Sequence, residues 1–556
     1  MKKTILTGAS VLALAIAAPA FAQAVNNDSN IEQTGDNLDA DVTQTGTLND
    51  SDVIQSEQYN KATVTQSGSN AKSTVTQNGI GAVPNANGNG ANIVEVTQTG
   101  DGAESEVTQS GTDFNEAEVY QDGDSYSSIM QDGTRQGAEV SQTGDLNESY
   151  INQSGNSNQV GNALQGGITG VVQTGDGNIS SIDQDPSSYV RAFVTQSGNN
   201  NDSNISQESF GGAGANTSSA DVSQSGEGNG SIINQNSATS PARQEAIVSQ
   251  NGTANMSDLI QSGQDNFASV KQDGTLNDST LTQQGNMASA TISQTGTGNI
   301  STATQGSPNR LTGSQQLNLI QYGNANESTI TQYGSENQAT VEQYGESNKS
   351  FVNQPGFDNS TGELNDGAVV SVGVFQDGED NRSTVTQSAN FGLAFVEQVG
   401  DNLTSTVTQQ GRANFAEAYI DQTGTFNAST ITQDAPTPAN GGPGGNMIAN
   451  VTQGGTGNTS TVSQTNTLGD PASSGNFADV SQTGTDGISM ITQDGHENDA
   501  FLNDDGISNE SYITQTGNLN FADVTQGGTD NVSTVNQVGD SNSATVTQGS
   551  AATPTS

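Results

Sequence analysis

The sequence predicts an all-β fold, a two-sided parallel β-solenoid of about 21 coils with about 22 residues per coil. Three observations predict this fold. Gln recurs every eleven residues, an aliphatic residue precedes it by two positions, and the residue four positions before it alternates between Ser and Ala. A repeat that covers almost the whole chain determines the architecture before any other feature.

The Gln repeat runs from Gln33 to Gln548. Allowing for short insertions, it has 42 positions, of which 41 hold Gln and one holds Asp504. Gln165 is assigned to an insertion, because counting it as a repeat position would break the Ser/Ala alternation that follows it. Low hydrophobicity with high net charge is typical of disorder, but so strict a period favours a stack of repeats.

Each eleven-residue unit is predicted to form one strand. Residues spaced by two lie on the same face of a strand, so the small, aliphatic and Gln positions face inward together. Thr, Asp, Glu and Ser occupy the outward positions between them, while Gly and Asn mark the turns. One aliphatic residue per strand is too little for an isolated sheet, but stacked strands would bury it.

The small position reveals the longer period. All 21 odd-numbered units have Ser there, and 17 of the 21 even-numbered units have Ala. The true repeat is therefore two strands and two turns, with odd strands in one parallel sheet and even strands in another. At about 4.8 Å per coil, the rod would be about 100 Å long.

The insertions follow the same alternation. Longer gaps come only after odd units, and they contain most of the prolines, such as Pro84, Pro308 and Pro438. Proline cannot donate to a strand ladder, so its absence from the strands is expected. One corner of each coil is therefore predicted to accept insertions and the other to exclude them.

The inward rows are the predicted assembly site. Each Gln amide is expected to hydrogen-bond to the Gln above and below it, and Asn is expected to do the same near the turns, because buried amides are costly unless paired. The residues chosen to represent these rows are Gln33, Gln44, Gln55, Gln66, Gln261, Gln272, Gln283, Gln332, Gln343, Gln515, Gln526, Gln537, Gln548, Asn266, Asn277, Asn337, Val270, Ile330, Ser257 and Ala268.

The chain is expected to have three parts. Residues 1–22 resemble a secretory signal peptide, with Lys2 and Lys3, a short apolar stretch and the cleavage pattern Ala20-Phe21-Ala22. That stretch is too short to span a membrane, and no later segment is apolar enough to insert into one. Residues 23–550 form the repeat domain and residues 551–556 a C-terminal tail.

Composition argues against several classes of function. The net charge is −48, and it becomes −50 without residues 1–22, which opposes binding to nucleic acid or anionic lipid. There is no Cys, and His496 is the only histidine, placed in a turn, so nucleophilic catalysis has few candidate residues. The acidic turns at 121–124 and 376–380 match no calcium-loop motif. We therefore expect no enzyme activity, no cofactor and no metal site.

The repeat resembles that of the curlin family. The family pattern is visible in Gln261-x-Gly263-x-x-Asn266-x-Ala268-x-x-x-Gln272, with Ser257 before it, and again from Gln332 to Gln343. The resemblance extends over residues 27–550. It implies a secreted subunit of a curli-like amyloid fibre at a Gram-negative cell surface, which supports biofilm matrix, adhesion and cell aggregation. It also implies an outer-membrane secretion channel, a nucleator and a periplasmic chaperone as partners. Known curlins have about five repeats, far fewer than this chain, and lack its insertions.

The ends of the repeat favour self-assembly. Strand units reach close to both ends of the sequence, and no capping helix is predicted there, so the open edges are expected to recruit further copies. One alternative is a monomeric adhesin or stalk that binds through the insertions at 355–366 and 434–446. Another is an ice-binding solenoid, because 7 of the 21 odd strands carry Thr-x-Thr.

Overall fold

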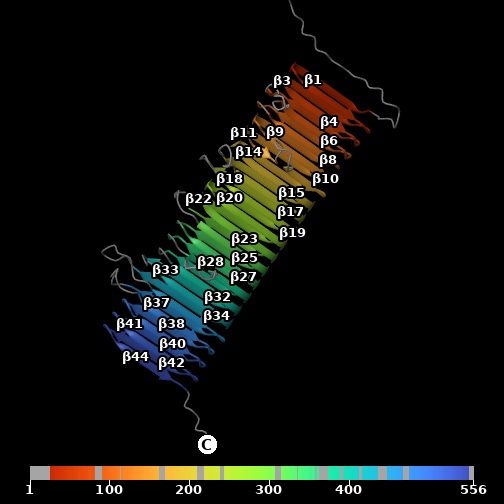
Figure 1. The fold of residues 1–556 in the computed structure, drawn as a ribbon. Helices are drawn as coiled ribbons and strands as arrows, with labels where there is room; N and C mark the ends of the chain where they lie inside the picture. The colour runs from red at the N-terminus through yellow and green to blue at the C-terminus, as the bar shows by residue number, and fades with distance from the viewer. Residues whose placement is uncertain are drawn as a thin grey trace, which may run out of the picture.

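The protein is an elongated stack of short strands lying across its long axis (Figure 1). The computed structural model describes residues 26–81, 91–112, 114–161, 170–209, 218–237, 243–306, 315–334, 336–356, 360–361, 373–388, 392–411, 416–435, 447–466 and 475–549. The strands fall into two parallel sheets, here named sheet A and sheet B, between which the chain passes alternately. This confirms the predicted two-sided β-solenoid.

Sheet A has 21 strands, each paired in parallel with the strand one coil earlier and one coil later. In stacking order the strands are β1 (Asp28–Asp36), β3 (Asp50–Gln58), β5 (Lys72–Gln77), β7 (Glu104–Gln109), β9 (Tyr126–Thr134), β11 (Glu148–Asn156), β14 (Ile179–Ser188), β16 (Asp202–Ser209), β18 (Gly230–Ser237), β20 (Met256–Gln264), β22 (Asp278–Asn286), β24 (Ile300–Gln305), β26 (Glu327–Gln332), β28 (Lys349–Gln354), β31 (Arg382–Gln387), β33 (Thr404–Gly411), β35 (Ala428–Ala435), β37 (Thr459–Thr465), β39 (Ile488–Asp494), β41 (Glu510–Thr516) and β43 (Val532–Val538).

Sheet B stacks the intervening strands in the same way. They are β2 (Asp39–Gln44), β4 (Asn60–Gln66), β6 (Asn92–Gln98), β8 (Glu116–Asp122), β10 (Gly137–Thr143), β12 (Gln159–Val160), β13 (Val171–Thr174), β15 (Val190–Asn199), β17 (Ser218–Glu227), β19 (Glu245–Thr253), β21 (Phe267–Thr275), β23 (Ala288–Thr297), β25 (Gln315–Asn324), β27 (Gln338–Glu346), β29 (Ser360–Thr361), β30 (Val374–Glu379), β32 (Leu393–Asp401), β34 (Glu417–Thr425), β36 (Ile448–Gln453), β38 (Phe477–Gln482), β40 (Asp499–Asp504), β42 (Phe521–Gln526) and β44 (Ser543–Gln548). Two rungs are each divided into two short strands, β12 with β13 and β29 with β30, which pair with the same neighbours.

Equivalent positions of successive units lie directly above one another. In sheet B, Ala246 pairs with Ala268 and Gln250 with Gln272. In sheet A, Ser257 pairs with Ser279. A slip of one residue would turn the inward row outward, so burial of the aliphatic row fixes the register.

The core is a single continuous cluster of aliphatic and alanine side chains between the sheets. Residues along a typical strand alternate between buried and more exposed, as in β22, where Ser279, Leu281 and Gln283 are buried. The predicted inward and outward faces are therefore confirmed. Each rung contributes little apolar area, so burial depends on the rungs above and below it.

The turns need tightly stacked backbone. Gly263 has a φ of +102°, and a Cβ there would collide with the carbonyl oxygen of Gly285 on the next rung. Leu276, just before Asn277, also has a positive φ, of 56°. Glycine at the first position avoids the clash, while the second tolerates larger side chains that point away from the stack.

Six of the longer insertions follow strands of sheet A, namely β5, β16, β18, β24, β35 and β37, as the sequence predicted. The prediction is wrong for the insertions after Gln153 and Gln354, because β12 and β29 have already joined sheet B there, so the longer gaps fall within rungs of sheet B, between β12 and β13 and between β29 and β30. Residues 1–22, Gln165, the tail at 551–556, and most of the insertions at 355–366 and 434–446 lie outside the described residues.

Candidate assembly site

Sheet A contains an unbroken ladder of glutamine amides. Each Gln donates from Nε2 to Oε1 of the Gln one rung later, from Gln33 to Gln537, at 2.7–2.9 Å. The second Nε2 hydrogen commonly reaches a backbone carbonyl of sheet B. Gln261, for example, donates to Glu245 O at 3.0 Å. The amides thus join successive rungs and also join the two sheets.

Sheet B carries a second ladder with one interruption. The bonds run from Gln44 to Gln482 and resume between Gln526 and Gln548. Between them stands Asp504, which is 2% exposed. Its Oδ1 accepts from Gly506 N at 3.1 Å and Asn509 Nδ2 at 2.7 Å.

The interruption leaves two amide atoms without partners. Gln482 Nε2 and Gln526 Oε1 are buried and form no hydrogen bond among the described residues. An ionised carboxylate donates no hydrogen bond, and the Asp side chain is one methylene shorter than Gln. The single exception in the sequence repeat is therefore also the single gap in the described amide ladders.

Asparagines form further ladders at the corner where sheet B leads into sheet A. Asn277 Nδ2 donates to Asn255 Oδ1 at 3.0 Å, and the same contact recurs from Asn299 back to Asn147. These bonds point from later to earlier rungs, opposite to the Gln bonds. The Asn277 backbone N–H also donates to Asn255 Oδ1 at 3.1 Å. Longer insertions are absent from this corner in the described strands, which keeps the ladder continuous.

The serine row of sheet A is poorly paired. Many of its hydroxyls are buried without a hydrogen-bond partner in the described residues, among them those of Ser257 and Ser279. Ser429 Oγ reaches Gln453 Oε1 in the opposite sheet at 3.0 Å, and Ser511 and Ser533 lie 2.8 Å apart. The amides, rather than the hydroxyls, form the polar connections along most of the rod.

Most of the representative residues chosen from the sequence lie in these rows, but Asn266 and Asn337 lie at the corner after sheet A, where their side chains donate to backbone carbonyls such as Gly285 O and Gly356 O. Gln33 lies on exposed β1, and Gln44 and Gln548 are half-buried on the end rungs. The others are buried, with exposed fractions from 0 to 6%: Gln55, Gln66, Gln261, Gln272, Gln283, Gln332, Gln343, Gln515, Gln526, Gln537, Asn266, Asn277, Asn337, Val270, Ile330, Ser257 and Ala268. Their role in assembly remains a prediction. The opposite directions of the Gln and Asn ladders could not be found from the sequence.

The two ends of the Gln ladders differ chemically. At the N-terminal end, Gln33 and Gln44 donate to the next rung, while no described side chain donates to their Oε1 atoms. At the C-terminal end, Gln537 and Gln548 donate from Nε2 to Phe521 O and Val532 O instead of to another Gln. One end of the rod therefore offers acceptors and the other offers donors.

Other kinds of site have little support in the part of the chain that the structure describes. His496 lies half-buried in a turn, where its backbone N–H donates to Asn518 Oδ1 at 3.3 Å. No group of three or more His, Asp or Glu residues there could hold a metal ion. The same residues contain no helix of the length and hydrophobicity needed to cross a membrane.

The chain matches one known family. Residues 263–296, 316–345, 378–411 and 517–549 match the family model described as the curlin associated repeat. Each matched segment ends at a glycine two residues after, or next to, a ladder Gln. A search of curated proteins found no significant match. The repeat and the fold together point to a structural, non-catalytic protein. The chain is therefore a β-solenoid protein that carries curlin associated repeats.

Proposed function

We propose that this protein is a secreted subunit that polymerises end to end into curli-like extracellular amyloid fibres, which serve biofilm matrix, adhesion and cell aggregation. The observation that carries the proposal is the complementarity of the two ends. Stacking the last coil of one copy on the first coil of the next would place the Nε2 of Gln537 opposite the Oε1 of Gln33. The ladders would then continue from one molecule into the next.

The coil order supports the same joint. The last described coil is β43 in sheet A followed by β44 in sheet B, and the first is β1 in sheet A followed by β2 in sheet B. In this joint, Ser533 would lie on Ser29 and Ala544 on Ala40. The next molecule would thus add one more coil of the same kind, with each sheet extended by its own strands.

Charge favours this polarity over a joint between like ends. Strands β43 and β44 contain no charged residue. Strands β1 and β2 contain five carboxylates, Asp28, Glu32, Asp36, Asp39 and Asp41. A head-to-head joint would stack acidic strands on each other, and like charges directly opposite are destabilising.

Export is part of the same proposal. We place the fibre at a Gram-negative cell surface, reached after cleavage behind residue 22 and passage through a curli-type outer-membrane channel, with a periplasmic chaperone and a nucleator as partners. The signal-like sequence of residues 1–22 and the curlin associated repeats support this. Detection of the protein in the surface fraction, without residues 1–22, tests the route.

The test of function is assembly of residues 23–556 in pure solution. We expect a lag, then Thioflavin-positive fibres with a meridional reflection at about 4.8 Å. A protein that stayed monomeric for days without this reflection would contradict the proposal and favour the adhesin alternative. Thermal hysteresis of the monomer would favour ice binding. The Thr array is interrupted by Phe351, which is the register partner of Thr329 and Thr384.

A further inference from the structure

The outer face of sheet A contains one site where two cations are register partners. Lys349 on β28 pairs with Arg382 on β31, so their side chains leave the same face one rung apart. Both residues precede the inward Ser of their strand and therefore point outward. Among the described strands, no other Lys or Arg has a Lys or Arg as its register partner.

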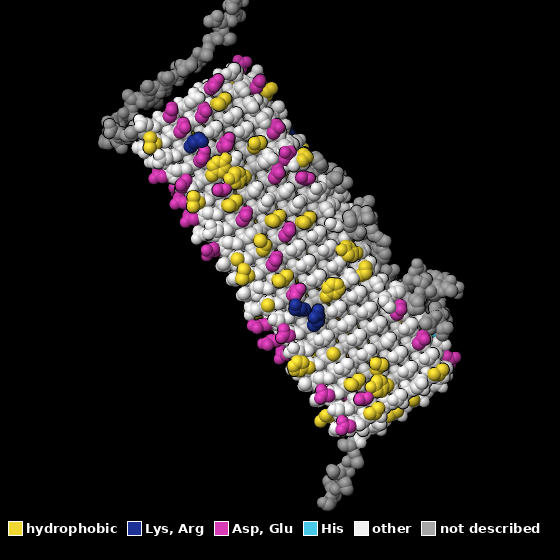
Figure 2. All heavy atoms as spheres, turned by 180° about the vertical axis from the view of Figure 1, so that it is seen from behind, with side chains coloured by type: hydrophobic (Ala, Val, Ile, Leu, Met, Phe, Trp, Pro, Cys, Tyr) yellow, Lys and Arg dark blue, Asp and Glu magenta, His cyan; other side chains and the backbone are white. Residues whose placement is uncertain are grey.

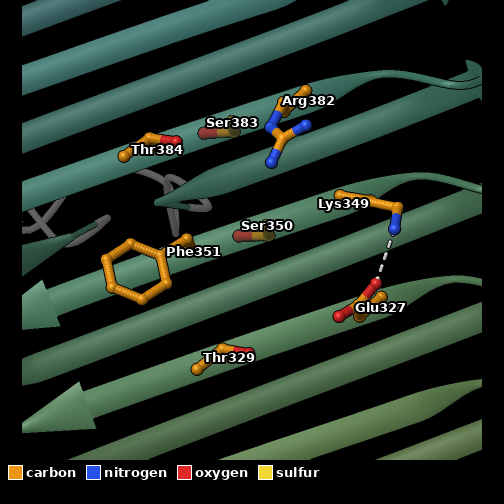
Figure 3. A pocket seen from close by; sticks show the side chains of 8 residues that line it. All are labelled: Glu327, Thr329, Lys349, Ser350, Phe351, Arg382, Ser383 and Thr384. Carbon is orange, nitrogen blue, oxygen red and sulfur yellow. Dashed lines mark hydrogen bonds and ion pairs between the residues drawn. The ribbon is translucent and has the colours of Figure 1, made fainter.

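These cations line two adjoining hollows. The first is also lined by Glu327, Thr329, Phe351 and Thr384, and Figure 3 shows Arg382 and Lys349 above Glu327 along its wall. The second is lined by Ser347, Asp380 and Asn402 as well as by the two cations. Lys349 Nζ forms an ion pair with Glu327 at 2.7 Å. Arg382 has no ion pair within the described residues, so its guanidinium remains open to a carboxylate.

The opposite face of the rod carries a column of carboxylates. On sheet B, Glu95, Glu118 and Glu139 are register partners on three successive rungs, and Glu116 lies beside them. None of the four forms an ion pair within the described chain. Partial burial, with the negative charges of Glu118 and Glu116, raises the pKa of Glu139 above its ordinary value. A cation approaching this column would offset that repulsion.

The two sets of charges have the same spacing. Cations and carboxylates both sit on strands about 4.8 Å apart, so two adjacent cations match two adjacent carboxylates without distortion. The rest of the visible surface shows many acidic and few basic side chains (Figure 2). Another copy of the rod therefore offers carboxylates at a matching spacing.

We propose that this cation pair, Lys349 and Arg382, binds the column Glu95–Glu118–Glu139 of a second copy, and so joins parallel rods face to face. Two rods in the same orientation present sheet A of one to sheet B of the other. The cations lie about ten rungs further along the rod than the carboxylates, so neighbours would be staggered by about 50 Å. Because the two surfaces differ, each rod can bind one neighbour on either face, and the contact does not close on itself.

Multiplicity makes this contact effective in fibres. A single exposed ion pair contributes little to affinity, so two monomers would associate weakly. A fibre would repeat the contact once per molecule, and the joined contacts would act together. The lateral contact depends on the proposed function only because fibre formation supplies these repeated contacts. It predicts salt-sensitive bundling of fibres, because exposed charges are screened beyond about 10 Å at 0.1 M salt.

The test compares charge reversals in full-length mature protein. Lys349→Glu with Arg382→Glu is the first variant, and Glu118→Lys with Glu139→Lys is the second. Each is expected to form single fibres of normal cross-β spacing but to lose bundling at low salt in electron micrographs. The four substitutions combined should restore bundling. The matched control, Lys61→Glu with Lys271→Glu, makes the same charge change at two cations far apart on sheet B and should bundle normally.

Three results would overturn the proposal. In the first, the Lys349/Arg382 variant bundles like the control. In the second, the fourfold variant stays unbundled. In the third, polygalacturonate binds to wild-type fibres but not to fibres of the first variant, and the second variant still bundles. This result would assign the cation pair to an acidic polysaccharide instead of a second rod. If no variant and no wild-type protein formed fibres, the axial proposal would fail instead. The lateral contact would then be tested by low-salt sedimentation of the monomers, where equal sedimentation of wild type and first variant would refute it.

Discussion

At the scale of single residues, the polar core depends on what each side chain can donate. A ladder Gln uses one amide hydrogen for the next rung and commonly uses the other for the opposite sheet, as Gln283 does with Gln305 and Phe267 O. A buried amide of this kind is costly to leave unpaired. Serine hydroxyls contribute less, since Ser279 Oγ is buried without a partner in the described residues.

Repairing the gap at Asp504 should stabilise the rod. Asp504→Gln supplies an acceptor for Gln482 Nε2 and a donor for Gln526 Oε1, the two atoms now left unpaired. We expect a gain of about 1–3 kcal/mol in the unfolding free energy, measured as a higher urea midpoint. The control is Asp505→Asn, an exposed neighbour outside the ladder, which should change the midpoint little. A midpoint that did not rise for Asp504→Gln would show that the gap costs nothing.

Two substitutions in β22 separate the amide row from the serine row. Gln283→Glu removes both donated hydrogen bonds and buries a charge, so we expect a loss on the order of 3 kcal/mol and slower fibre formation. Ser279→Ala removes a hydroxyl with no partner and should be neutral or stabilising. Thermal unfolding of the two variants and the wild type measures both effects. Equal losses would contradict the assignment of the polar connections to the amides.

At the scale of strands and turns, the corner after sheet B carries the longest Asn ladder, from Asn147 to Asn299, while the corner after sheet A carries shorter ones, such as that from Asn476 to Asn542. The corner after sheet B is held by contacts such as Asn277 to Asn255, which use both the side chain and the backbone N–H. The corner after sheet A has accepted insertions after β5, β16, β24 and β35. Most of the longer insertions therefore fall at the corner where the Asn ladders are shorter.

Matched insertions test this difference. Gly-Ser-Gly-Ser placed after Gln264, in the turn from β20 to β21, should leave the melting temperature close to that of the wild type. The same insertion after Thr275, in the turn from β21 to β22, separates Asn277 from its stacked partners and should lower the unfolding free energy by about 1–3 kcal/mol. Calorimetry of both variants provides the comparison. Equal effects would mean that the corners are equivalent.

Periodicity makes most of this fold predictable, because one slip would expose every inward side chain. The Gln spacing and the Ser/Ala alternation are sufficient to assign Gln272 to sheet B and Ser257 to sheet A. Other features depend on atomic geometry. The direction of the Gln bonds, the orphaned atoms beside Asp504 and the positive φ of Leu276 have no signal in residue type. Lys349 and Arg382 can be recognised as register partners only once the insertion between their two strands has been located.

At the scale of the whole molecule, partial burial of outward carboxyl groups opposes the folded rod at neutral pH. The net charge is −48, and burial is the first cause that raises the pKa of Asp221, Asp421 and Asp479 on sheet B. A carboxyl whose pKa is raised on folding binds its proton more tightly in the folded state. The free energy of unfolding should therefore increase as the pH falls from 7.

The pH dependence is testable within a defined range. The gain should begin as the pH drops through the raised folded-state pKa values and be complete below the ordinary values of 3.8 for Asp and 4.5 for Glu. Urea midpoints measured from pH 7 to 4 provide the curve. The triple variant Asp221→Asn, Asp421→Asn and Asp479→Asn should show a shallower rise. Stability that decreased over this range would contradict the sign of these shifts.

End-to-end growth depends on the joint between molecules, which cryo-electron microscopy of the fibres observes directly. We expect rungs about 4.8 Å apart that continue across the joint, with β43 of one copy paired to β1 of the next and Gln537 facing Gln33. Fibres in which like ends meet, or in which the rungs are interrupted by a contact between other surfaces, would contradict it.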